Sequence, residues 1–272
     1  MSRDWETTVL GTEGEVLKVL AELQGKQWLC RGQPECYGGL VPSIDRESRS
    51  GPTRHEKLAL ERRAINIFRS TARFFHHKGE RRALDDDITA LMVLRHYGVP
   101  TRLLDWTMSP YVAAYFAVSE SNGKDGEIWS FDRQLYESKG AEQWVKWPET
   151  TSDGSGAGSK FDAKLTAFDP DFQHNWLISV FYRGFPRHDA QSSAYTMTAQ
   201  FSINHERTIA DLLEDPSACH RYVVKQERKK RLQDRLREEH GICRRSLFPD
   251  SAGAAETVIK EVFSEGQSSS VV

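Results

Sequence analysis

The chain has 272 residues, of which 38% are hydrophobic and 28% charged, so it can bury a core and lacks the composition of a disordered protein. Its 37 basic residues balance 39 acidic ones, and the net charge of −2 does not indicate a nucleic-acid-binding or membrane-binding surface. The four cysteines form no CxxC pair, which favours reduced thiols over a zinc site. The longest apolar stretch, 111–118, is far shorter than the ~20 residues of a membrane helix. We therefore expect a cytoplasmic protein without a membrane segment.

Helical and extended patterns alternate in the first half of the chain. Leucines and valines at helical spacing predict a helix over 14–23, and an apolar run predicts a strand over 28–32. Residues 37–44 contain two glycines and a proline and should form a loop. Thr53 and Glu56 match a capping box, so a long helix is expected over 54–76.

The middle of the chain predicts a helix, a strand and a second helix in close succession. Three aspartates begin a helix over 85–97, which closes at Gly98. Residues 101–107 are extended, and Ser109-Pro110 starts a helix whose apolar run 111–118 should be buried nearly all round.

The second half alternates in the same way and shows no internal repeat, which favours one α+β domain. The elements expected there are strands over 127–131, 194–203 and 221–225, helices over 226–240 and 254–263, and a flexible Gly/Ser loop over 154–159.

Arg31-Gly32 at the end of a strand suits an anion clamp, because a guanidinium offers a planar fork of donors and glycine admits a close ligand. An ordinary ion pair at a strand end is the alternative.

The segment 96–107 places polar and charged side chains at high density between two helices, which favours a binding or catalytic role. The alternative makes Arg102 and Asp105 a buried structural pair and His96 a helix C-terminal cap. Thr107 and Ser109 stand where a helix N-terminus can bind phosphate, although ordinary capping explains either hydroxyl as well.

A third group lies near Gln191, which can present its amide from a strand edge or simply lie in a solvated loop. The familiar nucleotide-binding, hydrolase and metalloprotease motifs are absent from the sequence. The adjacent His76 and His77 diverge on a helix, so no metal site is expected.

Together these segments resemble the FRG domain family, named for an aromatic-Arg-Gly motif. Cys30-Arg31-Gly32, 40–44 and 96–117, which reads HYGVPTRLLDWTMSPYVAAYFA, look like its opening and its most specific segment. Residues 191–196 and 241–250 look like its later motifs, with Cys30 in place of the usual aromatic and Ser193 in place of the usual glycine.

A further similarity, to arginine-serine-glutamate ADP-ribosyltransferases, implies roles for these residues around NAD. It implies that Arg31 binds phosphate and that Gln191 replaces the catalytic glutamate, which leaves Asp105 as the carboxylate and His96 as a proton carrier. The further cofactor-binding residues it implies are Gly32, Tyr97, Arg102, Thr107 and Ser109.

These resemblances imply an α+β fold in a single domain, with a small split, mainly antiparallel sheet flanked by helices, as in ADP-ribosyltransferases. The expected organisation is a helical extension over 1–26, an FRG domain over 27–265 and a disordered tail over 266–272. The implied function is an NAD-consuming or ADP-ribosyltransferase-like enzyme, such as a toxin or phage-defence effector, acting on a protein or other macromolecule. The alternative is a non-catalytic FRG module that binds a nucleotide or a protein.

Overall fold

Seven strands form one sheet in the described part of the chain. The computed structural model describes residues 5–46, 53–71, 78–120, 123–146, 167–172, 177–180 and 186–258. The strands stand in the order β1-β7-β4-β2-β3-β6-β5, and every neighbouring pair is antiparallel except β1–β7. Their bounds are β1 Glu6–Leu10, β2 Trp28–Gln33, β3 Leu103–Thr107, β4 Gly126–Asp132, β5 Leu177–Val180, β6 Ser193–Thr198 and β7 Cys219–Val224. The expected α+β class with a mainly antiparallel sheet is confirmed.

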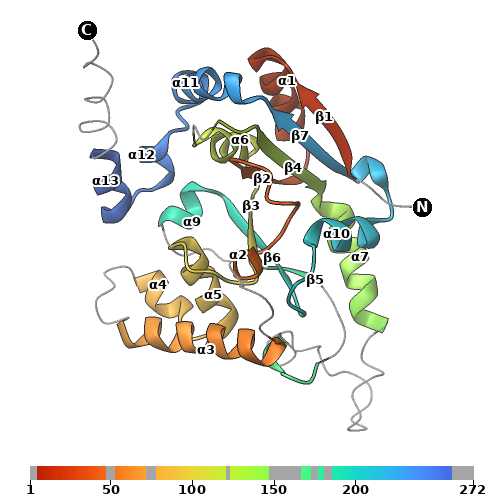
Figure 1. The fold of residues 1–272 in the computed structure, drawn as a ribbon, viewed down its shortest axis with the longest axis vertical. Helices are drawn as coiled ribbons and strands as arrows, with labels where there is room; N and C mark the ends of the chain where they lie inside the picture. The colour runs from red at the N-terminus through yellow and green to blue at the C-terminus, as the bar shows by residue number, and fades with distance from the viewer. Residues whose placement is uncertain are drawn as a thin grey trace.

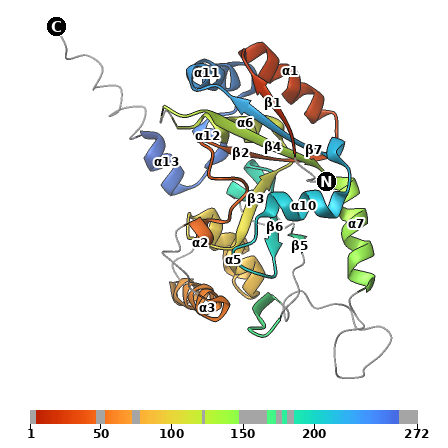
Figure 2. The same ribbon diagram turned by 45° about the vertical axis from the view of Figure 1, so that its right-hand side comes forward.

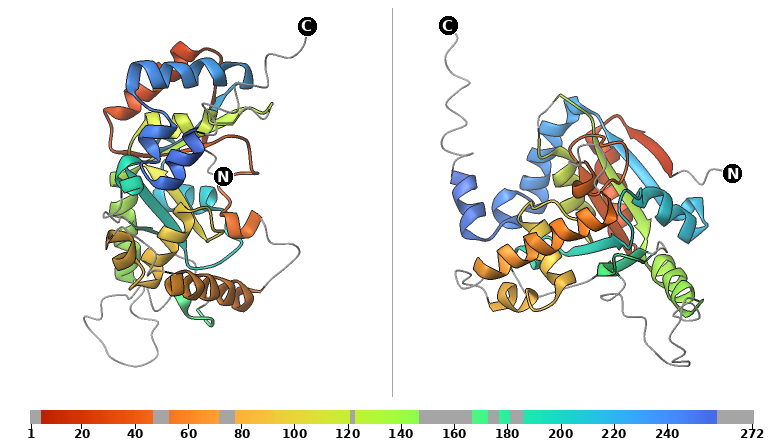
Figure 3. Two further views of the ribbon diagram at one scale, coloured as in Figure 1. Left: turned by 90° about the vertical axis from the view of Figure 1, so that its left-hand side faces the viewer. Right: turned by 60° about the horizontal axis from the view of Figure 1, so that its bottom comes forward.

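Helices pack on both faces of this sheet. The described helices are α1 Glu13–Gln24, α2 Ser43–Arg46, α3 Arg54–Thr71, α4 Lys78–Ala83, α5 Asp87–His96, α6 Pro110–Val118, α7 Arg133–Lys146, α9 Pro186–Ala190, α10 His205–Leu213, α11 Lys229–His240, α12 Arg244–Leu247 and α13 Ser251–Val258. Figure 1 shows α1 and α11 at one end of the molecule and α3, α4 and α5 at the other, an arrangement also visible in the left view of Figure 3. Helices α7 and α10 lie side by side at the edge seen on the right of Figure 2. None of the described helices combines the length and the apolar character needed to cross a membrane.

The helix boundaries follow the capping residues of the sequence. The Thr53 and Glu56 side chains each accept a hydrogen bond from the other residue's backbone, as a capping box requires. Asp86 accepts from two backbone amides at the start of α5, and Ser109 accepts from Val112 at the start of α6. Gly241 ends α11 in the left-handed conformation, with φ 66°. These predictions from the sequence are confirmed.

The sheet is nearly divided between β2 and β3. These strands share the single pair Cys30–Thr107, whereas β2 pairs with β4, and β3 with β6, along most of their lengths. On one face the two halves have separate cores, which include Cys30, Val112 and Ile128 in one and Leu94, Leu103 and Tyr195 in the other. On the opposite face a single core that includes Leu104, Trp106, Trp129 and Leu213 crosses the division. We call this division the split.

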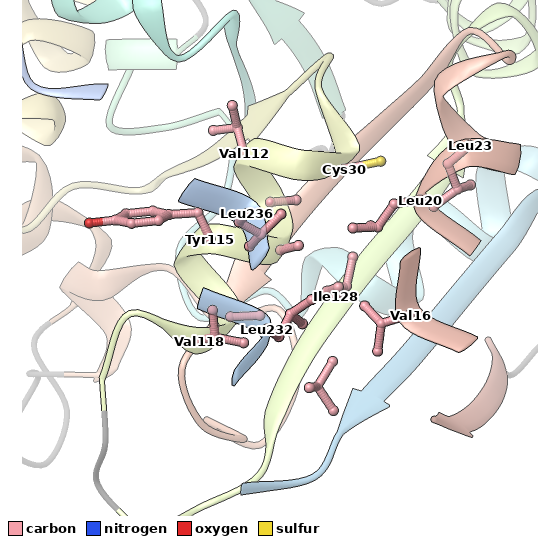
Figure 4. Packing of buried hydrophobic residues seen from close by; sticks show 14 of the residues in the cluster. Val16, Leu20, Leu23, Cys30, Val112, Tyr115, Val118, Ile128, Leu232 and Leu236 are labelled. Atoms are coloured by element: carbon pink, nitrogen blue, oxygen red, sulfur yellow. The ribbon is translucent and has the colours of Figure 1, made fainter. Parts of the chain in front are cut away.

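Helix α6 lies unusually close to the sheet beside the split. A Cβ atom on Gly32 would stand 2.6 Å from the backbone nitrogen of Ala117 and closer still to the carbonyl oxygen of Ala113. Gly126 on β4 meets the helix backbone in the same way. Figure 4 shows how α6 side chains such as Val112 and Val118 pack in this core with Ile128, Leu232 and Leu236.

Several elements of the structure were not predicted from the sequence. Strand β1 lies in the expected helical extension and pairs with β7, and α7 and α10 were not predicted. The strand expected over 194–203 ends at Thr198, whose hydroxyl donates to the carbonyl of Gln200 and so favours a turn. The 154–159 loop, the tail over 266–272, His76 and His77, and the ends of the helices expected over 54–76 and 254–263 lie wholly or partly outside the described residues.

Candidate functional site

The Arg31 side chain lies in the split and hydrogen-bonds a backbone group of β3 that β2 does not pair with. Beyond the Cys30–Thr107 pair, β2 and β3 separate, so the backbone of Asp105 has no partner on β2. Arg31 Nη1 donates to the Asp105 carbonyl oxygen at 2.8 Å and lies 2.9 Å from its carboxylate Oδ2. Because buried backbone groups must be hydrogen-bonded, a long cationic side chain here keeps the split open without leaving a carbonyl unpaired.

Asp105 stands between two guanidinium groups while remaining open to water. Arg95, at the end of α5, binds the other oxygen through Nε at 2.8 Å and Nη2 at 2.7 Å. The Asp105 side chain is 43% exposed, whereas that of Arg31 is 5% exposed. Partial burial alone would raise the pKa of the Asp105 carboxyl, but Arg31 and Arg95 hold it well below its usual range. A carboxylate in this state is a weak base at neutral pH.

Several candidate residues chosen from the sequence line one small cavity at this place, but His96, which was expected with them, does not. Residues from β2, β3, α6 and the start of β6 line a cavity of about 20 Å³, namely Cys30, Arg31, Gly32, Asp105, Trp106, Thr107, Phe116, Gln191 and Ser193. Such a volume holds about one water molecule, far less than a dinucleotide occupies. The enclosed space therefore cannot hold a dinucleotide.

The hydroxyl and amide groups of the cavity wall already have partners within the fold. Thr107 Oγ1 donates to the carbonyl oxygen of Gln191 at 2.7 Å and accepts from the backbone amide of Ser109 at 3.0 Å. Gln191 Nε2 donates to the carbonyl oxygen of Leu247 at 3.1 Å. Ser109 caps α6. These bonds fix β3, α6 and the chain before β6 around the cavity, so they position its walls.

Gly32 and Arg102 have structural positions that differ from the expected cofactor contacts. The space beside Gly32 is filled by α6 rather than left for a ligand. Arg102 is fully buried, and its Nε and Nη2 atoms contact Glu61 Oε2 at 2.9 and 2.6 Å. The expected alternative of an Arg102–Asp105 pair is wrong, because these side chains pair with Glu61 and with two other arginines respectively.

His96 and Tyr97 belong to a neighbouring cluster around Arg187. Arg187 Nε and Nη2 bind the Asp250 carboxylate at 2.5 and 2.7 Å, and its Nη1 donates to the His96 carbonyl at 3.1 Å. Tyr97 donates from its hydroxyl to Glu80 at 2.7 Å. Burial, followed by the charge of Arg187, lowers the pKa of His96 to about 3, so its imidazole is neutral and only weakly basic at pH 7. This environment disfavours His96 as a proton carrier.

Three residues that were not singled out from the sequence lie near Arg31. Arg95 precedes the segment that was singled out, and Tyr37 and Arg46 lie in and after the glycine-containing loop. The Arg46 guanidinium stacks on Tyr37, with 4.2 Å between Cζ and the ring centroid. Burial lowers the pKa of Arg31, Asp105 raises it, and Arg95 and Arg46 lower it again, so the three positive charges interact. We call Arg31, Arg46 and Arg95 the arginine cluster.

Among known protein families, the FRG domain model matches residues 26–126. This chain contains an FRG domain. The match covers β2, the glycine-containing loop and the segment 96–117, and its range also includes Arg46 and Arg95. The later motif at Gln191 and the C-terminal segment lie beyond it. No curated protein and no solved structure matches the chain.

No group of histidine, cysteine and acidic residues suited to a metal ion occurs among the residues that the structure describes. The charged and polar side chains that lie near Asp105 are instead guanidinium groups and a phenol.

Proposed function

We propose that this FRG-domain protein is a nucleotide-binding module, and that its ligand is a dinucleotide such as NAD. The observation that carries the proposal is the meeting of Arg31, Asp105, Thr107 and Gln191 at one split in the sheet, with Asp105 facing water. Open sites at the junction of two sheet halves, lined by a few convergent polar groups, are common places for small ligands.

The charges favour the phosphates of such a ligand over its rings. Guanidinium groups recognise phosphate oxygens with planar, charge-assisted hydrogen bonds. The enclosed cavity admits about one water, and Gly32 is covered by α6, so the residues fit the diphosphate of NAD better than a buried nicotinamide. We therefore expect the diphosphate at the mouth of the split and the rings of the ligand nearer the surface.

Binding and turnover can be separated with one set of ligands. The full chain is titrated calorimetrically with NAD, ADP-ribose and adenosine, and nicotinamide release from NAD is followed by chromatography. We expect NAD and ADP-ribose to bind, adenosine to bind far more weakly, and no nicotinamide to form. Thermal unfolding provides a second readout, because ligand at 100 times its Kd stabilises the folded state by about 2.7 kcal/mol. Absence of binding by NAD and ADP-ribose in both assays would refute the proposal.

A second candidate is an NAD-consuming ADP-ribosyltransferase that modifies a macromolecule. It is favoured by the position of Arg31, Thr107 and Gln191 on three neighbouring segments around one cavity, the arrangement implied by the resemblance to those enzymes. Against it, Gln191 carries no negative charge to stabilise a cationic transition state, and the Asp105 charge is already shared with two arginines.

Nicotinamide release would select this second candidate. The matched variant is Asp105→Asn, which removes the one carboxylate among the described residues that line the cavity and replaces it with a side chain of similar shape. Loss of release in the folded variant, with ADP-ribose still bound, would place Asp105 in the reaction. Release that is unchanged in Asp105→Asn would exclude it.

A further inference from the structure

The arginine cluster has more positive charge than its surroundings neutralise. Arg31 and Arg95 share the Asp105 carboxylate, one on each oxygen. Arg46 contributes a third guanidinium, and no carboxylate among the described residues lies within ion-pair distance of it. Among the described residues, three positive charges therefore share one negative charge, which leaves an excess of two.

Neighbouring carboxylates have other partners. Asp45, which precedes Arg46, lies 2.6 Å from Lys57 Nζ, and its other oxygen accepts from the Ser202 amide. Glu35, near Tyr37, is paired with Lys124. Neither is placed to neutralise Arg46, so the excess charge remains within the part of the chain that the structure describes.

Two donors of the arginine cluster have no acceptor. The Nε atoms of Arg31 and Arg46 are buried, and no hydrogen-bond partner for either occurs in the described part of the chain. Arg31 is 5% exposed, so its donor is costly to leave unpaired. Arg46 is held in place by its stacking on Tyr37, which reduces the entropy lost when the guanidinium orders around a ligand.

We propose that Arg46 and Arg95, which are partly exposed whereas Arg31 is buried, form a diphosphate-binding subsite in which Arg46 is the specific anion-binding residue. This inference rests on the proposed nucleotide ligand and names the residues that hold its phosphates. Arg95 is oriented by Asp105 and by Ser43, whose hydroxyl lies 3.2 Å from its Nη1. The Nε atom of Arg46 has no acceptor among the described residues, so this guanidinium has a donor available to an incoming phosphate.

The arrangement also predicts which ligands are rejected. A neutral nucleoside brings no charge to offset the two excess positive charges, whereas a diphosphate does. Asp105 would repel an anion placed directly on it, so the phosphate groups should sit beside Arg46 and away from the carboxylate. Inorganic pyrophosphate is therefore the smallest probe of the subsite.

The test is calorimetric titration of the full chain with inorganic pyrophosphate, ADP-ribose and adenosine at fixed ionic strength. The variants are Arg46→Gln and Arg46→Lys. The matched control is Arg231→Gln on the exposed side of α11, which makes the same change in charge away from the split. Thermal unfolding in the absence of ligand checks that each variant is folded.

We expect pyrophosphate and ADP-ribose to bind about tenfold or more weakly to Arg46→Gln, since a charge-assisted hydrogen bond is lost. Arg46→Lys should recover part of the affinity, and Arg231→Gln should bind as the unmodified chain does. Equal affinity of Arg46→Gln and the unmodified chain, an equal loss in Arg231→Gln, or no binding of pyrophosphate at all would overturn the subsite. If ADP-ribose binds equally well to Arg46→Gln, the subsite is wrong while the proposed nucleotide-binding function stands.

Discussion

Replacement of Gly32 by alanine tests whether this glycine serves the packing of α6. The added methyl group would stand 2.6 Å from the Ala117 nitrogen and closer to the Ala113 oxygen, whereas ordinary contact begins near 3.4 Å. Both neighbours are backbone atoms of a buried helix, so relief requires α6 to retreat by about 1 Å. Overpacking of a core costs about 1–3 kcal/mol, and we expect the upper end because no flexible side chain can yield.

Urea unfolding followed by circular dichroism measures this loss. The matched control is Gly25→Ala, because Gly25 has φ −77° and its Cβ position has only an ordinary contact at 3.8 Å. We expect Gly32→Ala to lose about 3 kcal/mol and Gly25→Ala to change by no more than about 1 kcal/mol. Equal stability of Gly32→Ala and the unmodified chain would refute the claim that α6 packs directly against Gly32. It would mean that the space beside Gly32 can accommodate added atoms, including those of a ligand.

Two further predictions concern buried charges. Glu61→Gln should lower the free energy of unfolding by about 3–5 kcal/mol, because it leaves the charge of the fully buried Arg102 without its ion-pair partner. Glu137→Gln on the surface of α7 should lower it by less than about 1 kcal/mol in the same urea assay. Similar losses in the two variants would contradict a structural role for Arg102. Burial lowers the pKa of His96 and His205 to about 3 in the folded chain. Below about pH 6.5 the unfolded chain therefore binds protons at these histidines while the folded chain does not. The free energy of unfolding should fall as the pH drops from about 6.5 towards 5, by up to about 1.4 kcal/mol per pH unit for each histidine. Urea unfolding across this window checks the slope, and a stability that does not change would show that these imidazoles are not buried as neutral groups.

Local signals in the sequence were sufficient for the elements that carry the site. The apolar pattern of β2, the aspartates before α5 and Ser109-Pro110 before α6 each act within a few residues of one another. They were predicted because caps and periodicity depend on nearby residues. Strand β1 was missed because its pairing with β7 joins positions more than 200 residues apart, and four of its five residues are exposed.

The partners of the charged residues could not be predicted in the same way. Arg102 and Asp105 are three positions apart, yet Arg102 pairs with Glu61 on α3 and Asp105 with Arg31 on β2. The chain has 39 acidic residues, so the sequence allows many possible partners for each arginine. The packing of α3 and the separation of β2 from β3 determine which carboxylate each arginine contacts. Arg46 was missed for the same reason, since its charge interacts with Arg31 and Asp105 only because the fold brings them near one another.

The candidate site residues were chosen from the sequence segment by segment, and only part of that set meets at the split. Arg31, Asp105, Thr107 and Gln191 line one cavity although they come from three strand regions. His96 was expected among them and instead lies with Arg187 and Asp250. Alternation along β3 places Asp105 and Thr107 on one face, but the direction of a side chain at a helix end, such as His96, depends on how α5 packs.

A crystal structure of the full chain with ADP-ribose would test the central claim most directly. The account predicts the diphosphate within hydrogen-bond distance of Arg46 and Arg95, at the mouth of the split beside Asp105. Diphosphate density elsewhere on the protein, with the arginine cluster contacting no ligand atom at saturating ADP-ribose, would contradict it.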